Sequence, residues 1–138
     1  MNLNEVFKFL DSEKLGVLAT VGEDGTPEAA LMGVVATPEL ELIFDTVKGS
    51  RKYPNLKNNS RVAFVIGFSA EVIVQYEGIA EELAGESLAK YKKIYFAKFT
   101  DGPLRESWPG ITYFVARPKW VRYCDYNPAT RQIEEKQF

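Results

Sequence analysis

Apolar and polar positions alternate along this chain with two different periods, and the period predicts each element. The first apolar positions recur every three or four residues, which is the spacing of one helix face; they are Leu3, Val6, Phe7 and Leu10. Asn2 and Glu5 form a capping-box pair, which is typical of a helix start. We therefore expect a helix over residues 2–12 that covers one end of the fold.

Period-two alternation then takes over and predicts a series of strands. The expected strands are residues 14–21, 28–36, 40–46, 61–68 and 71–83. Asp24-Gly25 is a hairpin signal, and Pro27 follows it at the start of the next strand. The run at 61–68 is almost continuously apolar, so we expect it to be buried on both faces. Gly78 should let its strand bend toward barrel closure.

The last third of the chain predicts one more helix and two more strands. Residues 85–99 carry an apolar stripe at helical spacing, and residues 100–110 form a loop. Strands over residues 111–117 and 119–126 follow, with an interruption at Pro118. Together these elements predict a mainly β fold with short helices, a small barrel of about 6–7 antiparallel strands with 2–3 helices.

Composition limits the class of protein. The 138 residues suit one domain, which we assign to residues 1–126, and polar residues 127–138 predict a loose tail or an addition to a sheet edge. A net charge of -2 argues against a nucleic-acid partner. The chain has no histidine and one cysteine, Cys124, which excludes histidine metal sites, Ser-His triads and an internal disulfide. The lone cysteine, with no signal-peptide pattern and no long apolar run, predicts a cytoplasmic protein without a membrane partner.

Residues 44–59 contain the candidate chemistry, at the point where a strand gives way to a short helix. The polar residues at the start of this stretch are Asp45, Thr46, Lys48, Ser50, Arg51 and Lys52. Hydroxyls, cations and unpaired backbone amides at such a junction are typical of an anion site. Arg51 can hold two phosphate oxygens at once, and Lys52 adds a point charge. The alternative is an ordinary strand-to-helix turn, with Ser50 as a cap and a solvated Arg-Lys pair.

Pro54 refines this prediction. It has no N–H and disfavours helical geometry at Tyr53, so we expect the regular helix to start at Pro54 itself. The amides of residues 50–53 would then face a ligand.

Thr46, Ser50, Arg51 and Lys52 keep the Thr-x-x-x-Ser-Arg-Lys spacing of a flavin-phosphate motif. In this the chain resembles the pyridoxamine 5′-phosphate oxidase-like family, the FMN-binding split barrels, and in particular its small general-stress or nitroimidazole-reductase-like branch. The continuation of the motif is also similar to that family: Asn55, Leu56, Asn59, Arg61 and Val62. The resemblance covers residues 1–125.

The resemblance implies a split β-barrel that binds FMN at the interface of a homodimer. The implied cofactor-binding residues are Leu31, Met32, Asp45, Thr46, Ser50, Arg51, Lys52, Gln75 and Trp108. Leu31 and Met32 would follow the flavin ring, Gln75 would hydrogen-bond it, and Trp108 would cap the ring of the partner. The residues alone leave an alternative open for each of these two. Gln75 also fits an ordinary surface position, and Trp108 also fits packing in the core of its own subunit. Dense aromatic side chains in residues 111–126 also favour a dimer interface.

The chain departs from the family near Ala30, where members often carry an arginine or a histidine. Residues 27–36 contain no basic side chain, and small residues there also fit close packing. The chain further lacks the C-terminal arginine–histidine pair with which true pyridoxamine phosphate oxidases hold their substrate, so we do not predict that activity.

These observations leave three functions open. The first is an FMN-dependent oxidoreductase that passes electrons from a nicotinamide donor to a small-molecule acceptor. The second is a non-catalytic flavin-binding carrier or sensor. The third is a split barrel that binds another anionic ligand, such as haem or a deazaflavin coenzyme, and the missing basic side chain near Ala30 keeps this one open. No catalytic residue and no metal site follow from the sequence.

Overall fold

The structure, a computed structural model, describes residues 1–68 and 70–138. Its helices are α1 (Leu3–Ser12), α2 (Lys52–Asn58), α3 (Gly85–Lys98) and a short 3₁₀ helix, η1 (Gly102–Arg105). Its strands are β1 (Leu15–Val21), β2 (Pro27–Gly33), β3 (Val35–Ala36), β4 (Leu42–Val47), β5 (Arg61–Ile66), β6 (Val72–Glu82), β7 (Ile111–Asp125) and β8 (Gln132–Gln137). The predicted mainly β fold is confirmed, with an 8-stranded sheet rather than six or seven strands.

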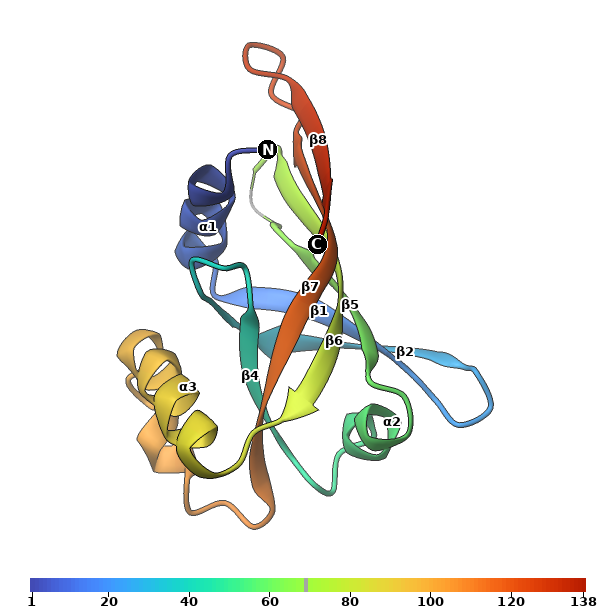
Figure 1. Cartoon of the computed structure of the whole chain (residues 1–138), viewed down its shortest axis with the longest axis vertical. Helices are drawn as coiled ribbons and strands as arrows, with labels where there is room; N and C mark the ends of the chain where they lie inside the picture. The colour runs from blue at the N-terminus through green and yellow to red at the C-terminus, as the bar shows by residue number, and fades with distance from the viewer. Residues whose placement is uncertain (69) are drawn as a thin grey trace.

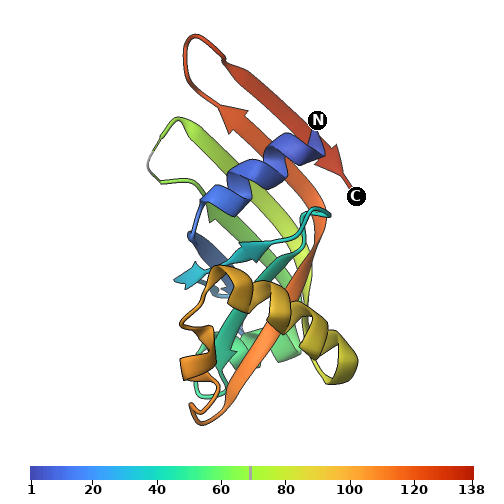
Figure 2. The same ribbon diagram turned by 90° about the vertical axis from the view of Figure 1, so that its left-hand side faces the viewer.

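The strands form one antiparallel sheet in the order β2-β1-β5-β6-β7-β4-β3, and β8 pairs with β7 beside this path. Figure 1 shows the sheet curled into a half-open barrel, with α1 and α3 on one side and α2 at its lower end. In Figure 2, α1 lies across the strands and α3 lies below it. The β1–β2 hairpin extends away from α1 and α3 and passes beside α2, and one face of this part of the sheet is left outside the barrel.

α1 starts where the sequence predicts it. The side-chain oxygen of Asn2 accepts hydrogen bonds from the N–H groups of Asn4 and Glu5 at 3.1 and 3.2 Å, which satisfies two free donors of the first turn. Val6 and Leu10 face the barrel and are each 1% exposed. The helix therefore closes one end of the main core.

β7 is continuous through Pro118, so the prediction of an interruption there is wrong. The register of β6 against β7 shifts between Glu77 and Gly78, which leaves Pro118 opposite Gly78 and Trp120 opposite Glu77. This bulge already breaks the hydrogen-bond ladder, so the missing N–H of the proline costs little. A Cβ on Gly78 would lie 2.5 Å from the carbonyl oxygen of Arg117, so the close approach of the two strands needs a glycine.

β5 alternates between the two faces of the sheet, which corrects the expectation that residues 61–68 are buried on both. Val62, Phe64 and Ile66 are buried, whereas Val65 is 40% exposed. Among the described residues, no helix covers the outer face of β1, β2 and β5, and this is why the apolar side chains on that face remain accessible.

The apolar side chains form two cores. The main core lies inside the barrel, where Phe44 stacks on Phe114 with ring centroids 5.5 Å apart and Phe64 meets Tyr76 edge to face. The second core lies between α3 and the strands β4 and β7, and it includes Tyr95. The two cores explain why the chain carries so many aromatic residues.

The aromatic residues of β7 belong mostly to these cores. Tyr113, Phe114 and Tyr123 are buried within their own chain, so these three side chains are used in its own packing. Trp120 is half-buried and Tyr126 is 46% exposed. Of the aromatic side chains in residues 111–126, all of which the structure describes, Trp120 and Tyr126 are the ones exposed enough to contact a partner.

Of the two alternatives for residues 127–138, the edge addition is the one that the structure adopts. β8 pairs with β7 from Trp120 opposite Gln137 to Asp125 opposite Gln132. Within the part of the chain that is described, no helix combines the length and the apolar character needed to cross a membrane.

Candidate functional site

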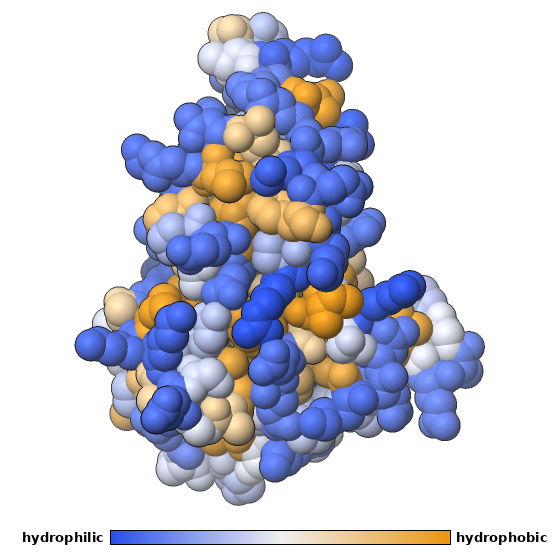
Figure 3. Space-filling model, viewed as in Figure 1, coloured by the Kyte–Doolittle hydropathy of each residue, from blue (hydrophilic) through white to orange (hydrophobic). Residues whose placement is uncertain are grey.

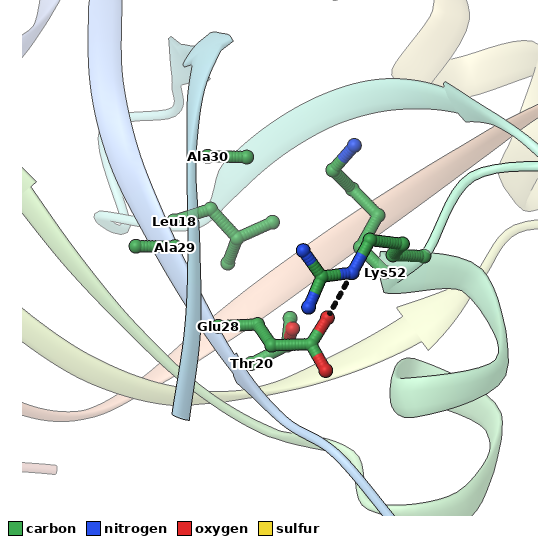
Figure 4. A pocket seen from close by; sticks show the side chains of 7 residues that line it. Leu18, Thr20, Glu28, Ala29, Ala30 and Lys52 are labelled. Carbon is green, nitrogen blue, oxygen red and sulfur yellow. Dashed lines mark ion pairs between the residues drawn. The ribbon is translucent and has the colours of Figure 1, made fainter. Parts of the chain in front are cut away.

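A pocket opens where the β1–β2 hairpin faces the start of α2 (Figure 4), and its volume is about 180 Å³. Its lining residues are Leu18, Thr20, Glu28, Ala29, Ala30, Arg51 and Lys52. Leu18 stands opposite Ala30 in the β1–β2 register, and Thr20 stands opposite Glu28, so these four side chains share the inner face of the hairpin. The pocket therefore joins that face to the first two cations of the α2 segment.

The turn before α2 is closed by its own polar groups. The Thr46 and Ser50 hydroxyl oxygens lie 2.9 Å apart in a hydrogen bond, and the Ser50 N–H donates to the Val47 carbonyl at 3.0 Å. The N–H of Lys48 donates to the carbonyl of Gly110 at 2.9 Å. Thr46 and Ser50 thus shape the turn, and neither lines the pocket that Arg51 and Lys52 reach.

α2 begins at Lys52, so the prediction that the helix starts at Pro54 is wrong. Arg51 already has helical dihedral angles, and the N–H of Tyr53 donates to the carbonyl of Ser50 at 3.3 Å. Pro54 is tolerated because it lies in the first turn, where an N–H has no helical acceptor in any case. Two of the four amides expected to face a ligand, those of Ser50 and Tyr53, are therefore engaged within the turn.

Two polar contacts fix α2 against the sheet. The side-chain amide of Asn55 donates to the Thr20 hydroxyl at 3.1 Å, and both residues are buried. The Tyr53 hydroxyl donates to the Glu82 carboxylate at 3.0 Å. Because Tyr53 and Asn55 lie among the first four residues of α2 and bond to two different strands, the start of the helix next to Arg51 is held in one place.

The carboxylate of Glu82 collects three donors from three parts of the chain. Besides Tyr53, it accepts hydrogen bonds from the Lys57 ammonium at 3.0 Å and from the Thr112 hydroxyl at 2.5 Å. Burial by itself raises the pKa of Glu82, but the hydrogen bonds from Thr112, Lys57 and Tyr53 outweigh burial and hold the pKa below its ordinary value. Glu82 therefore remains ionised at neutral pH and ties α2 to β6 and β7.

Glu28 is the charged residue of the pocket that the sequence prediction missed; Leu18, Thr20, Ala29 and Ala30 were not predicted as binding residues either. Its Oε1 lies 3.0 Å from Nε of Arg51, in the ion pair drawn in Figure 4, and its side chain is 20% exposed. The signal for it lies in the alternation of β2, because that alternation places Glu28 and Ala30 on the same face. The family pattern draws attention to a basic side chain near Ala30, whereas the charged side chain of this segment is the acidic Glu28, two residues earlier.

Asp45 lies on the α3 side of β4, outside the pocket. Its carboxylate lies 3.1 Å from Nε of Arg105, whose guanidinium also reaches Asp101 at 3.0 Å. Burial opposes the charge of Arg105, but the hydrogen bond and charge attraction from Asp45, together with the contribution of Tyr95, outweigh burial and raise the pKa of Arg105 above its ordinary value. In this structure Asp45 fastens the loop that contains η1 to β4.

Leu31 and Met32 point to opposite faces of β2, as neighbours in a strand must. Met32 packs against the main core, whereas Leu31 is 60% exposed on the outer face. Ala30 points toward the pocket in Figure 4 and Ala29 points away from it. Neither Leu31 nor Met32 lines the pocket, so the structure separates them from the cations.

Gln75 is exposed on the outer face, in one cross-strand row with Leu31, Val17 and Val65. Three strand spacings of about 4.8 Å place it roughly 14 Å from Leu31. The structure therefore brings Gln75 to the same face as Leu31 but not to the pocket of its own chain.

Trp108 is 53% exposed, so the alternative that it packs in its own core is wrong. It lies in the loop between η1 and β7, and this loop reaches the turn before α2 through the hydrogen bond from Lys48 to Gly110. The indole is thus accessible on a loop that contacts the turn through Gly110, and it does not line the pocket.

The family model described as Pyridoxamine 5'-phosphate oxidase matches residues 3–125. The chain belongs to this family. The predicted family and fold are confirmed, since the match covers every element from α1 to β7. No curated protein sequence matches the chain.

Solved structures agree with this membership. A heme binding protein from Mycobacterium smegmatis is 19% identical with a TM-score of 0.84, and the alignment covers 98% of this chain but only 57% of that one. The General Stress Protein 26 from Bacillus anthracis str. Sterne is 23% identical with a TM-score of 0.73, over 99% of this chain and 100% of that one. An F420 reductase is 28% identical with a TM-score of 0.67, over 83% of this chain and 93% of that one. The family's fold thus recurs in proteins named for different ligands.

Proposed function

We propose that the protein binds FMN and acts as an oxidoreductase that passes electrons from a nicotinamide donor to a small-molecule acceptor. The observation that carries the proposal is the pairing of Arg51 and Lys52 at a pocket whose opposite wall is the small side chain of Ala30. A guanidinium and an ammonium are the groups that compensate a phosphate dianion, and about 180 Å³ accommodates a phosphoryl group. The one group in the pocket that opposes an anion is the carboxylate of Glu28.

Bound FMN would supply the hydride and electron transfer. In this proposal the chain's own residues hold and orient the cofactor: Arg51 and Lys52 grip the phosphate, and Asn55 keeps the start of α2 in place through Thr20. The sequence has no histidine, so the proposed activity uses no imidazole for proton transfer, and true pyridoxamine phosphate oxidase activity is not proposed.

We also propose that two copies of the chain pair through the outer face of β1, β2 and β5, with the cofactor at their interface. Leu15, Leu31 and Val65 are 43%, 60% and 40% exposed on this face. A hollow of about 590 Å³ lies further along the same strands, where Ala19 and Ala63 are among its lining residues. Figure 3 shows apolar side chains in orange between charged ones over the middle of the sheet. Several large apolar side chains exposed on one sheet face, with polar side chains around them, are typical of protein interfaces.

A cytoplasmic location is part of the same proposal. Cys124 is free and buried, and a chain with one cysteine gains nothing from an oxidising compartment. A nicotinamide donor is also most available in the cytoplasm.

A deazaflavin coenzyme is the second candidate ligand. The similarity to an F420 reductase favours it, as does Glu28, which leaves the pocket with a lower positive charge than its two cations suggest. Haem is less favoured, because the sequence offers no histidine to ligate its iron.

The test begins with the visible spectrum of protein purified in excess FMN, which we expect to be that of a bound flavin. Arg51→Ala should weaken FMN binding about five- to thirtyfold, because a charged hydrogen bond from an exposed side chain contributes about 1–2 kcal/mol. Arg131→Ala, at an exposed arginine in the turn before β8, is the matched control and should change nothing. Colourless protein, together with unchanged ligand retention in Arg51→Ala, would contradict the proposal.

Stopped-flow reduction separates an enzyme from a carrier. An oxidoreductase should be bleached by NADH or NADPH faster than free FMN and be reoxidised by an acceptor. Bound flavin that reacts no faster than free FMN would identify the protein as a carrier or sensor instead.

A further inference from the structure

Arg51, the guanidinium proposed to hold an anion, is already paired with a carboxylate of the protein. Oε1 of Glu28 lies 3.0 Å from Nε of Arg51, inside the pocket that Lys52 also lines. The side chain of Glu28 is 20% exposed and that of Arg51 is 83% exposed. The carboxylate is thus the inner member of the pair, and the guanidinium is the member exposed to solvent.

The β1–β2 hairpin places this carboxylate where it is. Glu28 is the second residue of β2 and stands opposite Thr20, so the strand alternation turns its side chain to the inner face. A Cβ on Gly22 would lie 3.0 Å from Oε2 of Glu28, so the glycine at the end of β1 leaves the room that the carboxylate occupies. Among the described residues, the only partner recorded for this carboxylate is Arg51.

We propose that Glu28 is a built-in competitor for Arg51, so that an anionic ligand binds by exchange with the carboxylate and Glu28 sets the specificity of the pocket. The inference rests on the proposed binding of a phosphate-bearing cofactor. While Glu28 is in place, Arg51, Lys52 and the carboxylate together carry a single net positive charge. An incoming phosphate must detach the guanidinium from the carboxylate and then remains near it, and both effects weaken binding.

The exchange is feasible because the pair is weak by itself. An ion pair with a largely exposed arginine is screened by water and contributes little to stability. Glu28 is therefore held firmly enough to pair with Arg51 in the absence of ligand, and loosely enough to release the guanidinium to an anion. Riboflavin is the phosphate-free analogue of FMN. The pocket should therefore prefer FMN over riboflavin, but less strongly than the same pocket would without the carboxylate of Glu28.

Glu28→Gln tests this directly, because it keeps the size of the side chain and removes its charge. Titration of flavin fluorescence should show FMN binding about three- to twentyfold tighter in the variant, as expected for a nearby like charge in a partly screened site. Riboflavin affinity should stay the same, since riboflavin carries no phosphate. Glu23→Gln, at an exposed carboxylate in the same hairpin, removes the same net charge outside the pocket and should leave both affinities unchanged.

A double-mutant cycle with Arg51→Ala identifies the mechanism. If Glu28 competes for the guanidinium, most of the gain from Glu28→Gln should disappear when Arg51 is absent. An equal gain without Arg51, an equal gain for riboflavin, or no gain for FMN would overturn the proposal.

Inorganic phosphate separates this inference from the proposed function. If no variant binds FMN, the proposed flavoprotein function fails. Tighter phosphate binding to Glu28→Gln by calorimetry, lost again in Arg51→Ala, would then still support the competition between Glu28 and an anion. Unchanged phosphate binding would overturn it.

Discussion

Two carboxylates of similar burial behave differently at the residue scale because their partners differ. The side chain of Glu82 is 22% exposed and that of Glu28 is 20% exposed. Glu82 accepts hydrogen bonds from a phenol, an ammonium and a hydroxyl, whereas Glu28 has one exposed guanidinium. A carboxylate with several donors is fixed, and one with a single exposed donor is exchangeable. Glu82 therefore supports the site and Glu28 takes part in it.

The lowered pKa of Glu82 predicts a pH-dependent contribution to stability. Because its folded-state pKa lies below the ordinary value of 4.5, the contribution is fully present above about pH 4.5 and is lost as the pH falls through the folded-state pKa. Glu82→Gln should lower the free energy of unfolding by about 1 kcal/mol at pH 7. The difference from the wild type should shrink toward pH 3.

Urea unfolding of both proteins between pH 3 and pH 8 measures this difference. Glu39→Gln, at an exposed carboxylate in the turn before β4, is the control and should track the wild type throughout. A difference between Glu82→Gln and the wild type that stays constant down to pH 3 would show that Glu82 is not stabilised by these hydrogen bonds.

At the scale of elements, the β6–β7 ribbon decides the curvature on which the site depends. β7 runs from Ile111 to Asp125 and pairs with both β6 and β4, so it links the two halves of the barrel. The bulge at Gly78 and Pro118 lies where the partner on the other edge of β7 changes from β4 to β8, and a bulge bends its strand at such a point. β4 then delivers the turn with Arg51 close to the β1–β2 hairpin.

Gly78→Ala should therefore damage the fold. The new Cβ would lie 2.5 Å from the carbonyl of Arg117 and 2.8 Å from the ring of Tyr76, and neither the backbone nor the buried ring can yield easily. We expect a loss of about 2–4 kcal/mol in the free energy of unfolding, measured by chemical denaturation.

Gly49→Ala is the matched control for this substitution. A Cβ on Gly49 would meet nothing within 4 Å, so the free energy of unfolding of the Gly49→Ala variant should stay within about 0.5 kcal/mol of the wild type. If the two variants were equally stable, the bulge would not constrain the barrel.

At the scale of the whole molecule, the outer face of β1, β2 and β5 is the sheet surface that no helix of the described residues covers. Its apolar side chains are exposed, and the predicted ring contacts Leu31 and Gln75 lie on it rather than in the pocket. A flavin that contacted this face as well as Arg51 would have to lie along the hairpin edge. This arrangement is what a cofactor between two copies of the chain requires.

Val65→Glu tests this assembly. In a symmetric pair the substitution would bury two unpaired carboxylates, so the variant should sediment at the mass of one chain while the wild type sediments at the mass of two. The variant should also retain less FMN.

Leu104→Glu is the control, because Leu104 is 76% exposed on η1, away from the outer face, and its variant should still pair. Wild type at the mass of one chain at micromolar concentration would rule out the assembly. So would a Val65→Glu variant that still pairs.

The sequence by itself determined most elements and the family. Helical periodicity and the Asn2 cap placed α1, alternation placed β1 and β4, and the spacing from Thr46 to Lys52 located the two cations of the pocket. These features are local: each depends on a few neighbouring residues whose geometry is fixed by one period or one turn.

Only the tertiary structure decided which residues meet. Glu28 lies 23 positions before Arg51 in the chain, so no local pattern relates them, and their contact exists because the sheet curls the hairpin over α2. Asp45 was close to the cations in sequence yet pairs with Arg105, because neighbours in a strand point to opposite faces. The continuity of β7 through Pro118 likewise depends on a glycine forty residues earlier on the facing strand. Local periods fix the elements, whereas the register of one strand against another fixes the site.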